Sequence, residues 1–123
     1  MDGEIQPAEV KDLLDAGEDV CVVDIRNELH YQEAHIPTST NLPFQRLTRD
    51  VERFEGCDHV VTVCPHGQAS VQAARLIGSY EGFDGTVESM AGGLEAWEWE
   101  FEEGNGDDDS AETEESEGPE APF

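Results

Sequence analysis

Short apolar runs and amphipathic stretches alternate along the first hundred residues of the chain. Residues 20–25 and 59–63 are rich in β-branched side chains, a pattern typical of strands buried on both faces of a parallel sheet. A weaker strand is predicted at 86–88. Helical spacing of apolar positions is found at 7–17, 45–54, 70–81 and in a short closing segment with Ala96 and Trp97. This order of elements predicts an α/β domain with a parallel sheet.

The apolar pattern stops near residue 101. Residues 102–123 are mostly Asp, Glu, Ser, Gly and Pro, without apolar periodicity. Such a composition cannot bury enough surface to offset the entropy that ordering costs. We therefore expect one domain at 1–101, followed by an acidic disordered tail at 102–123.

The chain is strongly acidic. It carries 30 Asp and Glu residues against 6 Lys and Arg, a formal net charge of −24 at pH 7. The tail explains only part of this, because residues 1–101 hold 20 of the acids and all of the bases. A field of this sign repels nucleic acid and anionic membranes, so neither is expected as a partner. The pattern fits a halophilic protein, since a Debye length of about 3 Å at molar salt screens the self-repulsion. An ordinary acidic protein is the alternative.

Neither a signal peptide nor a membrane span is expected. The chain begins Met1-Asp2-Gly3-Glu4, and no apolar run approaches the roughly 20 residues that a spanning helix needs. Three cysteines at irregular spacing do not suggest a disulfide framework. These features predict a soluble, cytoplasmic protein with one functional thiol.

Cys64 stands where a reactive thiol is expected. It follows the strand predicted at 59–63 and opens a loop before a helix, for which Ser70 is the predicted cap. Ligands of open parallel sheets bind at the carboxyl ends of strands, and backbone N–H groups at a helix N-terminus converge on anions. Both features favour a thiolate, and Gly67 allows a sharp turn. The other interpretation of Cys64 is a small buried hydrophobic residue that ends a strand.

Four segments in this order resemble a single-domain rhodanese over about residues 4–101. Val23-Asp24-Ile25-Arg26 is similar to the Asp-x-Arg that follows an early strand in that family. Residues 33–37 (Glu-Ala-His-Ile-Pro) and 41–43 (Asn-Leu-Pro) are similar to its His-Ile-Pro segment. Residues 64–70 resemble the active-site loop, and Met90-Ala91-Gly92-Gly93-Leu94 with Ala96-Trp97 resembles the closing Gly-Gly…Trp signature. Together with the acidic composition, the resemblance suggests a rhodanese-like sulfurtransferase of haloarchaeal type.

The resemblance implies a three-layer α/β domain with a five-stranded parallel sheet flanked by helices. It also implies that Cys64 is the catalytic residue and carries sulfur as a persulfide, with no metal or organic cofactor. The substrate would be bound by the rest of the loop: Pro65, His66, Gly67, Gln68, Ala69 and Ser70. Asp24 and Arg26 are expected to support the loop without taking part in the chemistry.

Two places depart from the family pattern. Thr38 and Ser39 replace the usual Gly-Ala, a change that a loop can tolerate. Ala69 stands where many members carry an Arg that holds an anionic donor such as thiosulfate. The nearest cations in sequence are Arg26 and Arg75, and the sequence places neither of them in the site. The identity of the donor therefore stays open.

The spacing of these residues argues against a zinc site, a disulfide at Cys64 and a cysteine phosphatase. Cys57 and His59 could share a zinc ion with Cys64 and His66, but the strand between the pairs separates them by roughly 16 Å or more. Zinc holds its ligands at about 2.0–2.3 Å, and a disulfide requires Cα atoms within about 7 Å, so Cys57 is also excluded as a disulfide partner of Cys64. Cys21 is disfavoured because it begins a strand. A cysteine phosphatase needs an Arg where this chain has Ser70.

The sequence thus predicts a rhodanese-type sulfurtransferase. It would move a sulfane sulfur from thiosulfate or a persulfide donor to a thiol or another thiophilic acceptor. The Cys64 thiolate would attack the donor's outer sulfur, and the loop N–H groups would hold the persulfide until an external acceptor removes it. The alternatives are a sulfur-relay protein acting with a partner enzyme, or a non-catalytic binding module of the same fold. His66 is either a proton carrier or a solvent-facing loop residue.

Overall fold

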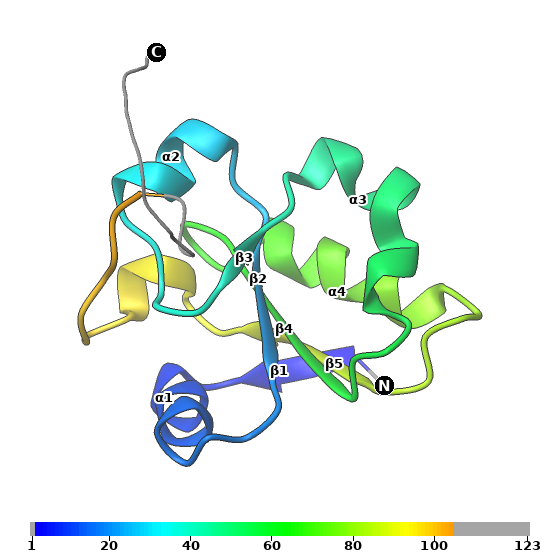
Figure 1. The fold of residues 1–123 in the computed structure, drawn as a ribbon, viewed down its shortest axis with the longest axis horizontal. Helices are drawn as coiled ribbons and strands as arrows, with labels where there is room; N and C mark the ends of the chain where they lie inside the picture. Colours follow the sequence, from blue (N-terminus) through cyan, green and yellow to red (C-terminus); the bar gives the residue numbers. More distant parts are fainter. Residues whose placement is uncertain (1, 105–123) are drawn as a thin grey trace.

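A computed structural model of the chain describes residues 2–104. The protein has a parallel sheet between two layers of helices (Figure 1). The strand order is β1-β5-β4-β2-β3, and every neighbouring pair is parallel. The strands are β1 (Asp2–Ile5), β2 (Cys21–Asp24), β3 (Thr40–Asn41), β4 (His59–Val63) and β5 (Thr86–Met90). The helices are α1 (Pro7–Asp15), α2 (Glu28–Glu33), α3 (Phe44–Asp50) and α4 (Ala69–Ser79), with the 3-10 turns η1 (Val51–Phe54) and η2 (Gly93–Ala96). The predicted five-stranded α/β fold is confirmed.

The sheet separates two hydrophobic cores, because successive side chains of a strand point to opposite faces. Val60 of the central strand β4 packs in one core with side chains of α3 and α4. Val61 and Val63 pack in the other core with side chains of α1 and η2. Figure 1 shows α1 on one side of the strands and α3 and α4 on the other. Burial on both faces explains why β2 and β4 read as nearly unbroken apolar runs.

Three elements were not predicted. The edge strand β1 pairs only with β5, and β3 has two residues, so neither carries a recognisable apolar pattern. The helix α2 is mostly polar. It is started by Asn27, whose side chain accepts a hydrogen bond of 2.9 Å from the backbone N–H of His30.

Several predicted boundaries are corrected by the structure. The helix expected at 45–54 is α3 followed by the tighter turn η1, and the expected closing helix is the 3-10 turn η2. The weak strand extends to Met90. Ser70 does not cap α4, because the helix begins at Ala69 and Gln68 precedes it. The Ser70 hydroxyl is instead turned toward the sulfur of Cys64.

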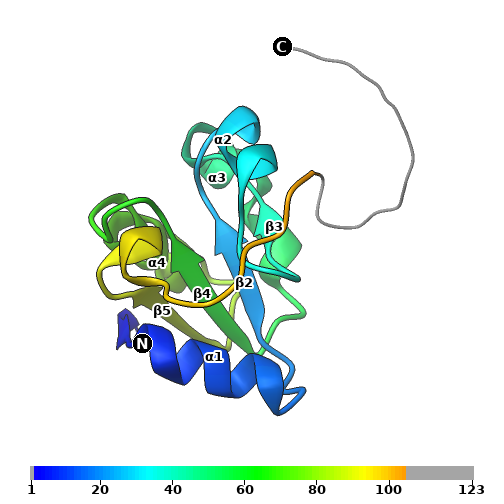
Figure 2. The same ribbon diagram turned by 90° about the vertical axis from the view of Figure 1, so that its left-hand side faces the viewer.

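The chain stays attached to the domain beyond residue 101. Glu102 and His35 exchange two backbone hydrogen bonds of 2.7 and 2.8 Å, and the N–H of Gly104 donates to the carbonyl of Gln32 at 2.8 Å. Figure 2 shows this C-terminal segment passing β2 on its way to α2. Residues 102–104 of the predicted tail thus contact the domain, and residues 105–123 lie outside the described residues.

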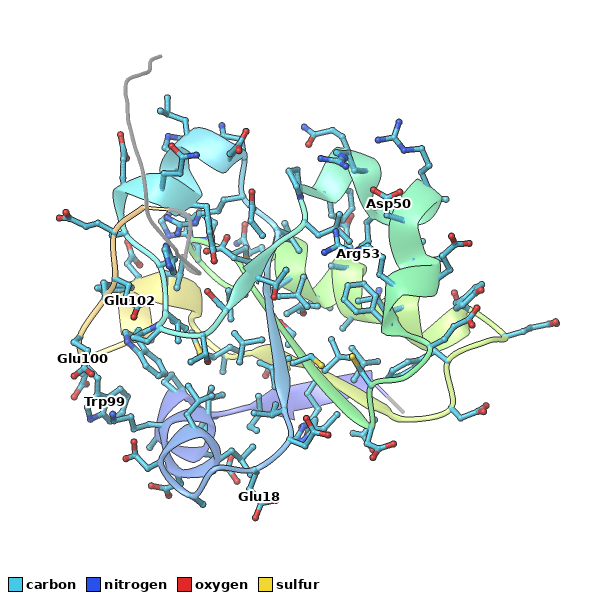
Figure 3. All side chains as sticks on the ribbon, viewed as in Figure 1. Glu18, Asp50, Arg53, Trp99, Glu100 and Glu102 are labelled. Carbon is cyan, nitrogen blue, oxygen red and sulfur yellow. The ribbon has the colours of Figure 1, made fainter. Side chains whose placement is uncertain are left out.

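Acidic side chains cover the outside of the domain. Glu18, Asp50 and Glu100 project from three different parts of the surface (Figure 3). Within the described part of the chain, Asp24 is the one acidic side chain that is fully buried. No helix among residues 2–104 is both long enough and apolar enough to cross a bilayer.

Thr38 has a left-handed backbone conformation, with φ at 71°. A β-branched residue is strained there by about 1–2 kcal/mol, whereas glycine adopts this conformation freely. We predict that Thr38→Gly stabilises the protein by about 0.5–1 kcal/mol after the entropy that glycine adds to the unfolded chain. Thermal unfolding would show a higher Tm. Thr48→Gly, at an exposed position of α3, is the control and should lower the Tm. A lower Tm for Thr38→Gly would contradict the assignment of strain.

Candidate functional site

Cys64 lies at the middle of the carboxyl edge of the sheet. It follows directly on β4, the strand between β2 and β5, and it is the link between β4 and the loop that leads into α4. The residue is 2% exposed and belongs to the core on the α3 and α4 side. A donor therefore has to reach the sulfur through the loop that covers it.

The sulfur of Cys64 is surrounded by hydrogen-bonding groups from the loop and from the first turn of α4. The backbone N–H of Gly67 donates to Sγ at 3.1 Å, and the N–H of Ser70 donates at 3.3 Å. The Cys64 thiol in turn donates to Ser70 Oγ at 3.3 Å. N–H groups at the positive end of a helix dipole stabilise an anion, so this arrangement suits a thiolate or a persulfide.

A second layer of polar groups holds Ser70. Its Oγ lies 2.6 Å from Oγ of Ser89 on β5, and its backbone carbonyl accepts a 2.7 Å hydrogen bond from the hydroxyl of Thr62 on β4. All three side chains are buried. Thr62 and Ser89 were missed in the sequence. For Thr62, the available signal was a hydroxyl residue inside the otherwise apolar part of β4; the mixed sequence of β5 gave no such signal for Ser89.

The Gly92-Gly93 turn packs against the backbone of the Cys64 loop. The N–H of Leu94 donates to the carbonyl of Cys64 at 2.8 Å, and the N–H of Glu95 donates to the carbonyl of Pro65 at 3.1 Å. Gly93 has φ at 67°, and a Cβ there would lie 2.4 Å from the carbonyl oxygen of Cys64. Gly67 has φ at 85°, and a Cβ there would lie 2.9 Å from the backbone nitrogen of Gly92. Two glycine turns thus fix the shape of the loop.

The outer rim of the loop is open to solvent. Pro65, His66, Gln68 and Ala69 are exposed, whereas Ser70 is buried against the sulfur. His66 Nδ1 lies 3.3 Å from a carboxylate oxygen of Glu95, and both side chains are largely exposed. The six predicted loop residues therefore divide into an exposed rim and an inner pair, Gly67 and Ser70, that contacts Sγ.

Comparison with known proteins decides the family. Residues 6–100 match the family described as the rhodanese-like domain. The chain belongs to this family.

Named relatives agree with the family match. The protein named thiosulfate sulfurtransferase GlpE from Pseudoalteromonas translucida is 37% identical over 99 residues, which cover 80% of this chain and 91% of that protein. A protein of the same name from Vibrio cholerae is 36% identical over 76 residues, which cover 62% and 70%. These relatives confirm the predicted class of enzyme, a rhodanese-type sulfurtransferase.

Solved structures support the same fold. A rhodanese-like domain protein from Staphylococcus aureus superposes with a TM-score of 0.69 at 22% identity, covering 78% of this chain and 91% of that one. The Alr3790 protein from Anabaena sp. superposes with a TM-score of 0.66 at 26% identity, covering 76% and 73%.

In this rhodanese-like domain, Asp24 and Arg26 form an ion pair that does not touch the loop at 65–70. Arg26 Nη2 lies 2.7 Å from one Asp24 carboxylate oxygen, Nε lies 3.0 Å from the other, and Nη2 also donates to the carbonyl of Ala34. Their link to the site runs through the backbone, because the N–H of Ile25 donates to the carbonyl of Val63 at 3.1 Å. The pair braces the segment after β2, and support of the Cys64 loop stays a prediction.

The structure shows the surroundings of the two arginines that the sequence could not place. Arg26 is held by Asp24 and Ala34, and Arg75 of α4 lines a surface hollow with Gly3 and Glu4 beside β1. No His, Cys, Asp and Glu side chains within residues 2–104 form a group of three or more that could hold a metal ion.

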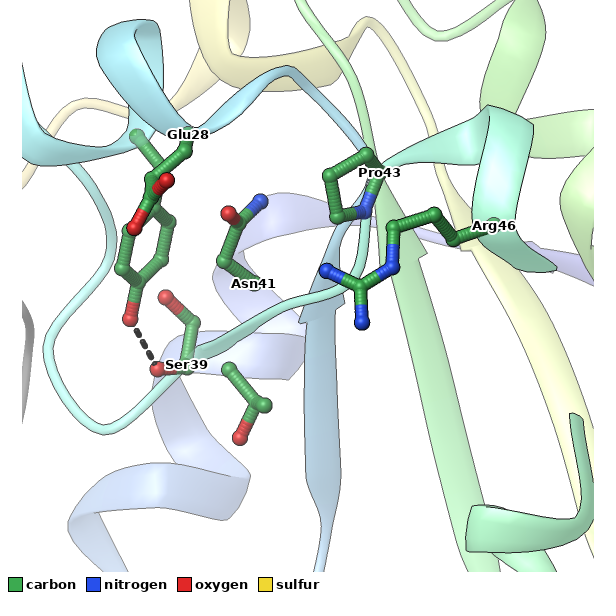
Figure 4. A pocket seen from close by; sticks show the side chains of 7 residues that line it. Glu28, Ser39, Asn41, Pro43 and Arg46 are labelled. Atoms are coloured by element: carbon green, nitrogen blue, oxygen red, sulfur yellow. Dashed lines mark hydrogen bonds between the residues drawn. The ribbon is translucent and has the colours of Figure 1, made fainter. Parts of the chain in front are cut away.

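A polar pocket is formed by residues of α2, β3 and α3 and of the segments next to them. It has a volume of about 330 Å³, and none of the residues that line it belongs to the Cys64 loop. In Figure 4, Glu28 and Arg46 face the hollow from opposite sides, with Asn41 between them. Arg46 also pairs with Asp50 at 3.4 Å. Asn41 donates to the carbonyls of Asp24 and Arg26, a structural role that the sequence did not suggest.

The other two cysteines are unlike Cys64. All three are free, but Cys21 and Cys57 lie at the amino end of the sheet, beside the starts of β2 and β4. Burial, with the neighbouring Cys57 and nearby carboxylates, raises the pKa of Cys21 to about 12. Cys21 thus stays protonated at neutral pH and is a poor nucleophile.

Proposed function

We propose that this protein transfers a sulfane sulfur through a persulfide on Cys64. The observation that carries the proposal is the pair of backbone N–H groups that donate to Sγ, from Gly67 in the loop and from Ser70 in the first turn of α4. These donors are fixed before any substrate arrives, which is the condition for electrostatic stabilisation without reorganisation. The two glycine turns keep them in place.

The reaction has two balanced steps. In the first, the Cys64 thiolate forms a bond to the outer sulfur of the donor, and the sulfur–sulfur bond of the donor breaks. With thiosulfate as donor, sulfite leaves with the electron pair; with a persulfide, a thiolate leaves. In the second step, a thiol or cyanide acceptor bonds to the outer sulfur, and the Cys64 thiolate is the leaving group. The remaining loop residues, Pro65, His66, Gln68 and Ala69, would form the rim where donor and acceptor bind.

The charge of the rim favours a persulfide over thiosulfate as the donor. Ala69 offers no cation, and the Glu95 carboxylate lies beside His66 at the same rim. A dianion such as thiosulfate is repelled there, whereas a persulfide carries less charge. This argument supports a sulfur relay, in which a partner protein presents the persulfide to Cys64.

Steady-state sulfur transfer to cyanide with two donors tests the proposal. We expect turnover with a low-molecular-weight thiol persulfide, and weaker turnover with thiosulfate. Ala69→Arg should raise kcat/KM for thiosulfate by roughly 10-fold or more, the effect of one added charge-assisted hydrogen bond, and leave the persulfide reaction nearly unchanged. If neither donor supports turnover, the enzyme proposal fails and the binding module remains.

The composition supports three further proposals. The acidic surface and the near absence of Lys support adaptation to high salt, as in a haloarchaeal protein. Unfolding midpoints measured across KCl concentrations would fall in dilute buffer. The free cysteines support a reducing, cytoplasmic location, which fractionation would test. Residues 105–123 are proposed as a solvating tail whose removal leaves transfer unchanged.

A further inference from the structure

Ser89 lies behind the site and has no contact with the sulfur. It comes from β5, is 1% exposed, and its Oγ lies 2.6 Å from Oγ of Ser70. Ser70 is itself fully buried and is the side chain whose oxygen lies 3.3 Å from Sγ of Cys64. The three groups thus form a chain from Sγ through Ser70 to Ser89.

The hydrogens of this chain can be arranged in two ways. If Cys64 is a thiol, its S–H donates to Ser70, and the Ser70 hydroxyl donates to Ser89. If Cys64 is a thiolate, both hydroxyls reverse: Ser89 donates to Ser70, and Ser70 donates to the sulfur. In the second arrangement Sγ accepts three hydrogen bonds, from Gly67 N–H, Ser70 N–H and the Ser70 hydroxyl. Every hydroxyl hydrogen of the chain then has an acceptor within it.

We propose that Ser89 is a positioning residue, which orients the Ser70 hydroxyl so that it donates to the Cys64 sulfur whenever that sulfur carries negative charge. The inference rests on the proposed function. Negative charge resides on Sγ at the start of the first step, when the thiolate attacks, and it develops there again in the second step, when Cys64 leaves. A donor that is already oriented raises the fraction of Cys64 present as thiolate for the first step. It lowers the barrier of the second step, in which negative charge develops on Sγ.

Without Ser89 the Ser70 hydroxyl has a competing partner. A serine hydroxyl can rotate about its Cα–Cβ bond and hydrogen-bond to a nearby backbone group instead. The 2.6 Å contact with Ser89 holds Ser70 Oγ toward β5 instead, on the side of the sheet that carries Cys64. Thr62 fixes the backbone of Ser70 from β4, so the rotation of the side chain is the one degree of freedom that Ser89 controls.

Alkylation of Cys64 by iodoacetamide at neutral pH tests the inference without needing sulfur transfer. Ser89→Ala should lower the alkylation rate by roughly 10-fold or more, the effect of one hydrogen bond to a charged group. Ser89→Thr, which keeps the hydroxyl, should restore most of the rate. Ser79→Ala removes a serine hydroxyl from the exposed side of α4 and should leave the rate unchanged.

A double-mutant cycle separates positioning from a general loss of structure. Ser70→Ala should slow alkylation at least as much as Ser89→Ala, and adding Ser89→Ala to it should change the rate little further. In transfer assays, Ser89→Ala should lower kcat and leave KM for the donor nearly unchanged. Two results would overturn the inference. One is an alkylation rate of Ser89→Ala equal to that of the wild type; the other is a double variant whose loss of rate equals the product of the losses in the two single variants. If neither the wild type nor any variant transfers sulfur, but Ser89→Ala and Ser70→Ala still slow alkylation as expected, the proposed function fails and the inference about Ser89 stands.

Discussion

Replacing Cys64 by Ser is expected to abolish sulfur transfer while leaving the fold intact. The hydroxyl is of similar size and can accept the same N–H groups of Gly67 and Ser70, so the Tm should move by only a few degrees. It is a far weaker nucleophile than a thiolate and cannot carry the sulfur. We therefore expect kcat/KM to fall by at least about 10³-fold with every donor.

The matched controls are the other two cysteines. Cys57→Ser and Cys21→Ser change thiols at the opposite end of the sheet and should keep near wild-type transfer. Cys21 is also expected to resist alkylation at neutral pH, because its pKa is raised to about 12. Transfer that survives in Cys64→Ser, or that is lost in Cys57→Ser, would place the nucleophile elsewhere.

Gly93→Ala is expected to have the largest effect on stability. The residue has φ at 67°, and its added Cβ would lie 2.4 Å from the Cys64 carbonyl oxygen and 2.5 Å from the Gly67 nitrogen. These are backbone atoms, which cannot move aside as a flexible side chain can. Either the loop shifts, or the variant is destabilised by about 3 kcal/mol or more. In both cases the donors to Sγ are displaced, and transfer should fall by at least about 10²-fold.

Gly17→Ala is the control for the backbone conformation alone. Gly17 has φ at 73°, close to that of Gly93, but a Cβ there meets nothing within 4 Å. Gly17→Ala should lower the free energy of unfolding by only about 1–2 kcal/mol and leave kcat/KM unchanged. Denaturant unfolding and transfer assays of both variants measure the difference. Equal loss of stability in the two would show that the close packing of Gly93 on the Cys64 loop is not significant.

The central part of the site could be predicted from the sequence because its signals are local. The strand β4, Cys64, Gly67 and the start of α4 follow one another within residues 59–70, and each has a distinct signature. The β-branched run predicts β4 with the bounds that the structure has, 59–63. Rules for parallel sheets then place Cys64 at the carboxyl edge.

The rest of the site depends on contacts between distant segments. Ser89 and Gly93 meet the Cys64 loop only because β5 pairs with β4 in a particular register, Thr62 opposite Ser89. A single sequence does not contain that register. Ser70 has the residue type of a helix cap, so its sequence position suggested capping, while its tertiary contacts use the hydroxyl for the sulfur. Edge strands as short as β3 are fixed by pairing with a neighbour and leave too little pattern to predict.

The most direct test is the mass of the intact protein after incubation with a sulfur donor. Wild-type protein treated with a thiol persulfide, and then freed of the small molecules, should gain the mass of one sulfur atom. Cyanide should remove that mass, and Cys64→Ser should never acquire it. A wild-type protein that gains no sulfur from persulfide or thiosulfate, or a Cys64→Ser variant that gains it as readily as wild type, would contradict a persulfide on Cys64.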